Sequence, residues 1–381
     1  MTNILTIIGA RPQIIKAAAL IRMIRTEFSG AIREEILHTG QHYDHNMSQI
    51  FFEEMNIPEP DYQLNISTEF QGEQCAQMIN GIEKILFDRK PDIVVVYGDT
   101  NSTLAASIAA SKLQIPIAHI EAGLRSHNKA MPEELNRIYC DYASTLLFCP
   151  TQIAVDNLKK ENITHADTDK FDINHKGVYL SGDVMYDNVL YYSAIAESKS
   201  EIISKLGLTK GRYLLCTIHR NYNTDNSERL YNILNALNFI ISLYNIEIIL
   251  PIHPRTANII NNNNQLKEIS KKNKLLRITA AVSYFDMLML QKYSQMILTD
   301  SGGLQKEAYF MDKPCIILRS ETEWTELLSS GNAVIADANP DLILKAFKSF
   351  LHNETNINYK ALYGDGNAAR FICNIIKTIF K

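Results

Sequence analysis

The chain lacks the sequence features that mark several classes of protein. Its 381 residues contain no basic block, and the formal net charge is −4. We therefore expect no binding surface for nucleic acid or for an anionic membrane. No apolar run approaches the length of a membrane span, and the run after Met1 is short and soon followed by Arg11 and Lys16. With neither a membrane segment nor a secretion signal expected, we predict a cytoplasmic protein.

Cysteine is sparse, and no Cys-x-x-Cys spacing occurs. The six cysteines stand singly in mostly apolar surroundings, at Cys75, Cys140, Cys149, Cys216, Cys315 and Cys373. This pattern favours reduced thiols in the core over a disulfide framework or a structural zinc site. A Walker loop and a Ser-His-Asp nucleophile are also lacking, and no carboxylate lies near His219 or His253 at metal-ligand spacing. We therefore expect no metal and no cofactor.

The features that the sequence does have are typical of an α/β protein with two domains. Hydrophobic residues make up 46% of the chain and charged residues 21%, and the length allows two separate cores. Short apolar runs that end at Gly, Asp or His alternate with helical patterns, which indicates βαβ units and parallel sheets. The first series of strands reads NILTIIGA, EEILHTG, PDIVVVYGD, IPIAHIEAG, TLLFCPT and GVYLSGD, and the second reads RYLLCTIH, NIEIILPIHP, KLLRITA, SQMILTDSGG and KPCIILR.

These series predict two Rossmann-like doubly wound domains, over residues 1–185 and 186–365. A helical pattern at residues 366–381 is expected to pack back on the first domain. In such sheets ligands bind at the carboxyl ends of the strands, so two domains that face each other would line a central cleft.

The stretch ILTDSGGLQKEAYF places Ser301, Gly302 and Gly303 between an apolar strand and a helix. Backbone N–H groups at the start of a helix bind anions, and glycine allows close approach, so a phosphate is the expected ligand. Glu307 follows one turn later, where a carboxylate can accept hydrogen bonds from a ribose diol. The alternative is that these residues only cap the helix.

Carboxylates and cations follow several other predicted strands. Asp99 ends VVVYGD, Glu121 ends IAHIE, and Glu133 and Glu134 lie at a helix start. Carboxylates held together in a site poor in water raise one another's pKa, which suits proton transfer near neutral pH. Helix capping by Asp99 and a favourable helix dipole for Glu133 remain open alternatives. The candidate anion ligands are Arg11, Lys16, Arg125, Arg137, His219 and His253. An arginine comes shortly after each of the two histidines, Arg220 after His219 and Arg255 after His253.

An ordered set of motifs resembles the non-hydrolysing UDP-N-acetylglucosamine 2-epimerase family, from near Ile4 to near Arg370. The motifs read GARPQ, GQHYDHNM, VVYGDTNSTLAAS, IPIAHIEAGLRS, MPEELNR, GDVMYD, IHR, PIHPRT, LTDSGGLQKEA and YGDGNAA. The resemblance implies the fold of the B-type glycosyltransferases (GT-B), a homodimer, and inversion at C2 of a UDP-sugar through elimination and re-addition of UDP.

The resemblance also assigns roles to residues of this chain. It implies that Asp99, Glu121, Glu133 and His219 are catalytic, without saying which carboxylate is the base. It implies that the nucleotide is held by Arg11, Lys16, Arg137, Ser301, Gly302, Gly303 and Glu307, and we add His253 to the substrate-binding candidates because PIHPRT ends a strand.

The chain departs from the common family pattern at Tyr222, where Glu is usual, and at TEWTE, residues 322–326, where TERPE is usual. GARPQ and TEW look more like the branch that acts on UDP-2,3-diacetamido-2,3-dideoxyglucuronate for surface polysaccharides. Tyr222 and Trp324 are then candidates for an apolar wall beside an acetyl group, and Arg319 or Arg125 for contact with the uronate. A retaining glycosyltransferase and a nucleotide-sugar sensor without activity are the alternative functions.

Overall fold

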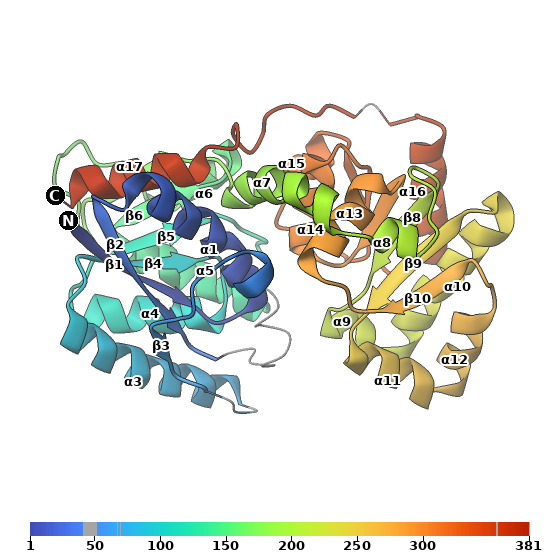
Figure 1. Cartoon of the computed structure of the whole chain (residues 1–381), viewed down its shortest axis with the longest axis horizontal. Coiled ribbons are helices and arrows are strands. Elements are labelled where there is room, and N and C mark those ends of the chain that lie inside the picture. Colours follow the sequence, from blue (N-terminus) through green and yellow to red (C-terminus); the bar gives the residue numbers. More distant parts are fainter. Residues whose placement is uncertain (41–51, 67, 69, 356, 381) are drawn as a thin grey trace. The chain divides into compact units, whose positions relative to one another are not determined.

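The computed structural model describes residues 1–40, 52–66, 68, 70–355 and 357–380. The motif GQHYDHNM lies outside the described residues from Gln41 onward. The chain divides into two compact units, one of residues 1–191 with 361–381 and one of residues 192–360. Both are α/β units built on a parallel sheet, as predicted (Figure 1).

The sheet of the first unit has seven parallel strands in the order β3-β2-β1-β4-β5-β6-β7. The strands are β1 (Thr2–Ile8), β2 (Ile32–His38), β3 (Tyr62–Gln63), β4 (Ile93–Tyr97), β5 (Ile117–Ile120), β6 (Leu146–Cys149) and β7 (Gly177–Leu180). The strand order reverses between β1 and β4. At such a switch point the loops after the two strands diverge and leave room for a ligand.

Helices cover both faces of this sheet. They are α1 (Arg11–Met23), which continues into the π-helical turn η1 (Ile24–Phe28), α3 (Gln71–Arg89), α4 (Asn101–Lys112), α5 (Pro132–Ala143), α6 (Gln152–Lys160), the start of α7 (Val184–Lys199), and α17 (Ala368–Ile379). Apolar side chains of α3, α4 and α5 form one core with β1 and β4. Helix α17 packs against α1, and Figure 1 shows this pair on the opposite face of the sheet from α3 and α4.

The sheet of the second unit has six parallel strands in the order β10-β9-β8-β11-β12-β13. The strands are β8 (Tyr213–Thr217), β9 (Glu247–Ile252), β10 (Leu276–Ala280), β11 (Met296–Thr299), β12 (Cys315–Ile317) and β13 (Ala333–Ile335). The order reverses between β8 and β11, so the second unit also has a switch point.

The helices of the second unit follow its strands in alternation. They are α8 (Ile202–Lys205), α9 (Asn221–Thr224), α10 (Ser227–Tyr244), α11 (Pro254–Asn262), α12 (Asn264–Lys271), α13 (Tyr284–Tyr293), α14 (Gly302–Phe310), α15 (Thr325–Ser329) and α16 (Pro340–Leu351). Apolar side chains of α10, α12 and α16 form a continuous core with β8, β9 and β11.

The sequence patterns found every strand except β3 and β13. Both missed strands lie at a sheet edge and have only two and three residues. An edge strand pairs on one side only, so it needs no long apolar run. The six cysteines are unpaired and all but Cys75 are buried, as expected for core thiols.

Candidate active site

The switch point of the first unit brings Lys16 and Glu121 together. Lys16 lies on α1 after β1, and Glu121 follows β5. The Lys16 Nζ atom donates to Glu121 Oε1 at 2.7 Å, and both side chains are less than a tenth exposed. Gly98, after β4, faces this pair, because a Cβ atom built at Gly98 would lie 2.9 Å from Lys16 Nζ. The loops after β1, β4 and β5 thus meet at one buried ion pair.

The backbone of Glu121 is unusual. Its φ is +72°, in the left-handed region that a residue with a side chain rarely adopts. Its N–H and that of Ala122 both donate to the carbonyl of Phe148 in the neighbouring strand, at 3.1 Å each. Strained backbone of this kind persists only where surrounding contacts hold it, and it is common in functional sites.

Asp99 and Arg137 form a second ion pair in the same unit. Arg137, on α5, donates to Asp99 Oδ2 through Nη2 and to Glu134 Oε2 through Nη1, the latter at 2.8 Å. The Arg137 side chain is buried, whereas a quarter of the Asp99 side chain is exposed. Asn136 Nδ2 also donates to the Asp99 carbonyl at 2.9 Å. Asp99 is therefore held at both its carboxylate and its backbone.

Of the two glutamates at the start of α5, Glu134 is the buried one. It accepts from the backbone N–H groups of Ser126 and His127, at 2.9 Å each. Burial opposes its ionisation, but these hydrogen bonds and the Arg137 charge outweigh burial and lower its pKa. Glu133, the residue predicted to be catalytic, is half-buried beside it in the first turn. Arg11 is half-buried at the first position of α1.

In the second unit His219 pairs with a carboxylate that the sequence analysis missed. His219 follows β8, and Asp300 follows the adjacent strand β11. His219 Nδ1 lies 2.9 Å from Asp300 Oδ1, and half of the imidazole is exposed while Asp300 is fully buried. Asp300 also accepts from the N–H groups of His219 and Arg220. Burial opposes its ionisation, but the contacts with His219 outweigh burial and lower its pKa. A buried carboxylate on one ring nitrogen orients the other for proton transfer.

Ser301, Gly302 and Gly303 begin α14 as predicted. Ser301 is the N-cap residue, and its side chain accepts from the N–H of Leu304 at 3.5 Å. Gly302 is tightly surrounded, because a Cβ atom there would lie 2.4 Å from Glu323 Oε1. Glu307 is buried one turn later, and its Oε2 atom accepts from Gln291 Nε2 of α13 at 2.7 Å. Gln291 is a second residue that the sequence analysis missed.

The segment 319–326 is buried against the start of α14. Arg319 Nη1 lies 3.0 Å from Glu323 Oε2 and forms an ion pair with it. The Lys306 ammonium lies 4.1 Å from the centre of the Trp324 ring. Trp324 is only 2% exposed, so its ring is covered by protein.

Three of the expected sugar contacts have other partners in the structure. Arg125 is buried between Asp141 and Glu161, so we withdraw it as a ligand for a uronate. Tyr222 is exposed, with the Arg229 guanidinium 3.9 Å above its ring. The burial of Trp324 is at odds with an open apolar wall for an acetyl group.

His253 caps α11, where its Nδ1 atom accepts from the N–H of Arg255 at 3.3 Å. Its side chain is exposed. Arg255, however, pairs with Asp225 and donates to Asn221, so its charge is already compensated. At His253 the His-Arg pattern thus combines a helix cap with local ion pairing.

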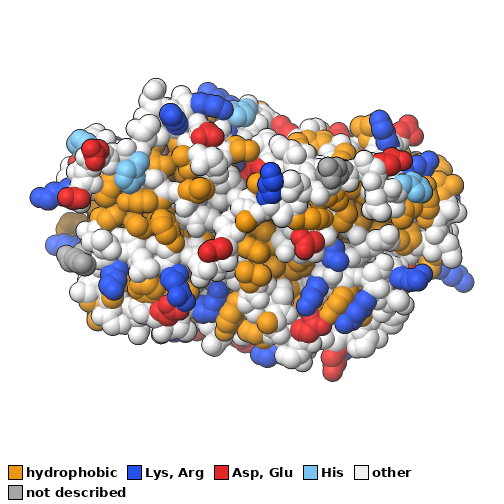
Figure 2. Space-filling view, turned by 90° about the horizontal axis from the view of Figure 1, so that it is seen from above, with side chains coloured by type: hydrophobic (Ala, Val, Ile, Leu, Met, Phe, Trp, Pro, Cys, Tyr) orange, Lys and Arg blue, Asp and Glu red, His pale blue; other side chains and the backbone are white. Residues whose placement is uncertain are grey.

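Across the residues that the structure describes, no group of three His, Cys, Asp or Glu side chains is arranged to hold a metal ion. No helix in this part of the chain is long and apolar enough to cross a membrane. On the face drawn in Figure 2, Lys and Arg side chains are interspersed with Asp and Glu.

Comparison with known proteins gives a consistent result over nearly the whole chain. The family model described as UDP-N-acetylglucosamine 2-epimerase matches residues 25–377. A UDP-2,3-diacetamido-2,3-dideoxy-D-glucuronate 2-epimerase of Pseudomonas aeruginosa is 43% identical over 98% of this chain and 99% of its own. A UDP-N-acetylglucosamine 2-epimerase of Methanococcus maripaludis is 40% identical over 99% of this chain and 98% of its own. The crystal structure of the Methanocaldococcus jannaschii UDP-GlcNAc 2-epimerase with UDP-GlcNAc and UDP is similar, with a TM-score of 0.88, 41% identity, and coverage of 98% of this chain and 99% of that chain.

Proposed function

The chain belongs to the UDP-N-acetylglucosamine 2-epimerase family, and from this premise we propose that it inverts C2 of a UDP-2-acetamido sugar. The hydrogen at C2 leaves as a proton while UDP departs from C1, which gives a glucal with a C1–C2 double bond. C2 is then protonated on the opposite face, and UDP adds back to C1. Such a reaction requires a group that takes and returns a proton, and donors that stabilise the charge on departing UDP.

The observation that supports this proposal best is the Lys16–Glu121 pair beside Asp99. Glu121, which supplies the carboxylate, has strained backbone, and the pair packs against Gly98, whose Cβ would meet Lys16. A salt bridge needed only for stability requires neither feature. We assign proton transfer at C2 to Asp99, Glu121, Glu133 and His219, with Asp300 orienting His219.

We assign UDP binding to residues of both switch points. Ser301, Gly302 and Gly303 offer the N-terminus of α14 to the diphosphate, and Glu307, held by Gln291, accepts from the ribose. Arg11, Lys16, Arg137 and His253 are the proposed side-chain ligands for the remaining polar groups of the substrate.

Of the two candidate sugars, we propose the 2,3-diacetamido-glucuronate as the better substrate and UDP-N-acetylglucosamine as a slower one. The motifs GARPQ and TEW support this choice, whereas overall identity does not separate the relatives, at 43% and 40%. Side-by-side kinetics on the two nucleotide sugars decide it. A clear preference for UDP-N-acetylglucosamine would refute this choice and leave the 2-epimerase activity intact.

Incubation with UDP-N-acetylglucosamine in D2O, without an acceptor, tests the proposed activity. An epimerase exchanges the C2 hydrogen for deuterium and forms the C2 epimer, which mass spectrometry and NMR detect. A retaining glycosyltransferase leaves C2 unlabelled, and a sensor leaves the ligand unchanged. The same assay is repeated with the diacetamido sugar, in case the enzyme accepts only that substrate. Absence of deuterium exchange with both nucleotide sugars would refute the proposal.

We further propose that the protein is cytoplasmic and, as the family resemblance implies, a homodimer. Light scattering of the purified protein measures its mass directly. A mass near twice 43.2 kDa is expected, and a monomer at working enzyme concentrations would contradict this assignment.

A further inference from the structure

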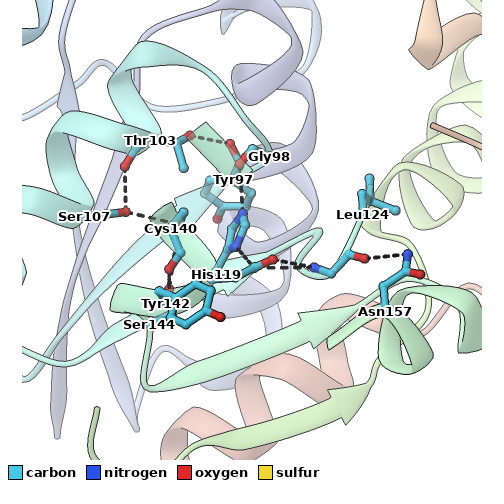
Figure 3. A network of polar contacts seen from close by, with 12 residues as sticks. Tyr97, Gly98, Thr103, Ser107, His119, Leu124, Cys140, Tyr142, Ser144 and Asn157 are labelled. Carbon is cyan, nitrogen blue, oxygen red and sulfur yellow. Dashed lines mark hydrogen bonds and ion pairs between the residues drawn. The ribbon is translucent and has the colours of Figure 1, made fainter. Parts of the chain in front are cut away.

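A mostly buried polar network lies next to the segments that contain Asp99 and Glu121, and Figure 3 shows the part of it around His119. Its centre is Asp141 of α5, which is 0% exposed. The Asp141 carboxylate is 2.8 Å from His119 Nδ1, accepts from the N–H of Gly123 at 3.2 Å, and accepts from Arg125 Nη1 at 2.8 Å. These residues flank Glu121 on both sides in the sequence. One carboxylate therefore holds the segment before and after the strained residue.

The His119 imidazole makes a second contact, to the other catalytic segment. Its Nε2 atom lies 2.8 Å from the carbonyl oxygen of Gly98, the residue before Asp99 (Figure 3). Gly98 has a φ of +61°, and its N–H donates to the carbonyl of Ile120. The ring thus joins the loop after β4 to the loop after β5. A change at His119 alters both loops at once.

The contacts of His119 fix its charge. Both ring nitrogens face oxygen acceptors, a carboxylate on one side and a carbonyl on the other, so both must carry hydrogen. Burial opposes the charged imidazole, but the neighbouring Cys140 and Asp141 together outweigh burial and raise the pKa of His119 well above its usual value. On the far side Arg125 also binds Glu161 with two contacts of 2.7 Å. Two cations and two anions balance within the network.

Stability alone is a poor explanation for this arrangement. Buried ion networks contribute little net stability compared with apolar side chains of similar size. What this network does provide is a fixed geometry, because each member is held by at least two directional contacts. The segment that it fixes contains Glu121, whose backbone would otherwise relax to a less strained conformation.

We propose that Asp141 and His119 are positioning residues for C2 epimerisation, holding Glu121 and Asp99 in the geometry that proton transfer requires. This inference rests on the proposed function. Neither residue touches the substrate. Asp141 fixes the backbone around Glu121 through His119, Gly123 and Arg125, and His119 transmits the same constraint to Gly98 and Asp99.

Two variants test the proposal, and a third is the control. Asp141→Asn keeps the shape of the side chain but removes the charge between His119 and Arg125. His119→Gln keeps one donor, which serves Asp141 or Gly98 but not both. Asp187→Asn is the matched control, because Asp187 is also a buried carboxylate of the first unit, and it accepts from the N–H groups of Ala368 and Ala369 at the start of α17.

The measurements are kcat and KM, the Kd of UDP, and the kinetic isotope effect with a UDP-sugar deuterated at C2. We expect Asp141→Asn to lower kcat by about a hundredfold, the scale of a misplacement of about 1 Å, and His119→Gln to lower it by about tenfold or more. KM and the Kd of UDP stay within about twofold of wild type, and the isotope effect rises because proton transfer becomes the slow step. Asp187→Asn loses thermal stability but keeps kcat and the isotope effect of the wild type.

The opposite results overturn the proposal. If the kcat of both variants, corrected for the folded fraction, matches that of Asp187→Asn, the network is structural. A lower kcat with an unchanged isotope effect, or a parallel loss of UDP affinity, leads to the same conclusion. If Asp141→Asn does not fold, His119→Gln decides, since it leaves the contact between Asp141 and Arg125 in place. Absence of C2 exchange in the wild type refutes the proposed function, whereas exchange in the wild type with near-normal variants refutes this inference alone.

Discussion

Replacement of Gly302 by alanine should destabilise the second unit, although alanine is the better helix former. Gly302 is the first residue of α14, where alanine in place of glycine usually stabilises a protein by about 0.4–1 kcal/mol. Here the added Cβ would lie 2.4 Å from Glu323 Oε1 and 3.5 Å from Trp324 Nε1. The Glu323 carboxylate must shift, which disturbs its ion pair with Arg319.

The structure sets the size of this effect. Both side chains of the Arg319–Glu323 pair are 7% exposed, and removal of one partner of a buried pair costs about 3–5 kcal/mol. Gly302→Ala shifts Glu323 without removing it, so this cost is an upper limit. After subtraction of the helix gain, we expect the variant to lower the free energy of unfolding by at most about 2–4 kcal/mol. Urea unfolding followed by the fluorescence of Trp324 measures it, because Trp324 is the one tryptophan of the chain and lies beside the site of the change.

A double-mutant cycle isolates the cause. In a Glu323→Ala background the added methyl has room, so Gly302→Ala should then change stability by less than about 1 kcal/mol. Gly72→Ala is the control for a methyl added to a helical glycine, since nothing lies within 4 Å of its Cβ position, and circular dichroism follows its effect. Gly302→Ala and the double variant should both bind UDP less tightly than the wild type, because the added methyl occupies the helix N-terminus in each. Equal destabilisation in both backgrounds, or none in the wild-type background, would refute the reasoning.

Three further predictions concern the proposed catalytic residues, the proposed ribose ligand Glu307 and the carboxyl group of Glu34. Asp99→Asn, Glu121→Gln, Glu133→Gln and His219→Ala should each lower turnover by about a hundredfold or more in the epimerisation assay, and near-normal turnover in two of them would show that the assignment is wrong. Glu307→Ala should weaken UDP binding by about 1.5–3 kcal/mol in calorimetry, and Gln291→Leu should weaken it less, because Gln291 acts only through Glu307. Burial raises the pKa of Glu34 from 4.5 to about 7. Between these two pH values the folded chain retains a proton on Glu34 that the unfolded chain releases, so the free energy of unfolding falls as the pH rises from 4.5 to about 7. Glu34→Gln removes this charge, so it should stabilise the protein by about 1–3 kcal/mol at pH 8, a range that allows for the partial exposure of the side chain, and by little near pH 4.5. Equal melting shifts at both pH values would contradict this prediction.

The strands were predictable because a parallel strand covered on both faces requires a continuous apolar run. Strand β4 is fully buried, and its sequence IVVVY (Ile93–Tyr97) contains no charged residue. The short edge strands β3 and β13 leave no such run. The division between the two units falls within α7, and a boundary inside a continuous helix produces no change in composition.

The partners of the site residues were not predictable from sequence, because they depend on strand order. His219 and Asp300 are 81 positions apart, and they meet because β8 and β11 are adjacent in the sheet. Gln291 reaches Glu307 from another helix in the same way. A sequence pattern shows where strands end, but not which strand ends are neighbours. His119 was hidden for a different reason, since a histidine inside an apolar strand looks like an ordinary core residue until its acceptors are known.

The ion pair at Arg319 bears on the choice between the two proposed sugars. A uronate carboxylate gains from a guanidinium only to the extent that its charge is not already compensated. Arg125 is excluded because Asp141 and Glu161 both bind it within the first unit. Arg319 has Glu323 as its partner, and that carboxylate lies over Gly302 at the start of α14. A substrate carboxylate therefore binds Arg319 only if it displaces the Glu323 carboxylate. Glu323 would then move away from Gly302, the glycine that we assign to the diphosphate. Recognition of the sugar acid and access of phosphate to α14 would then depend on the same side chain, and Glu323→Ala should favour the uronate over UDP-N-acetylglucosamine.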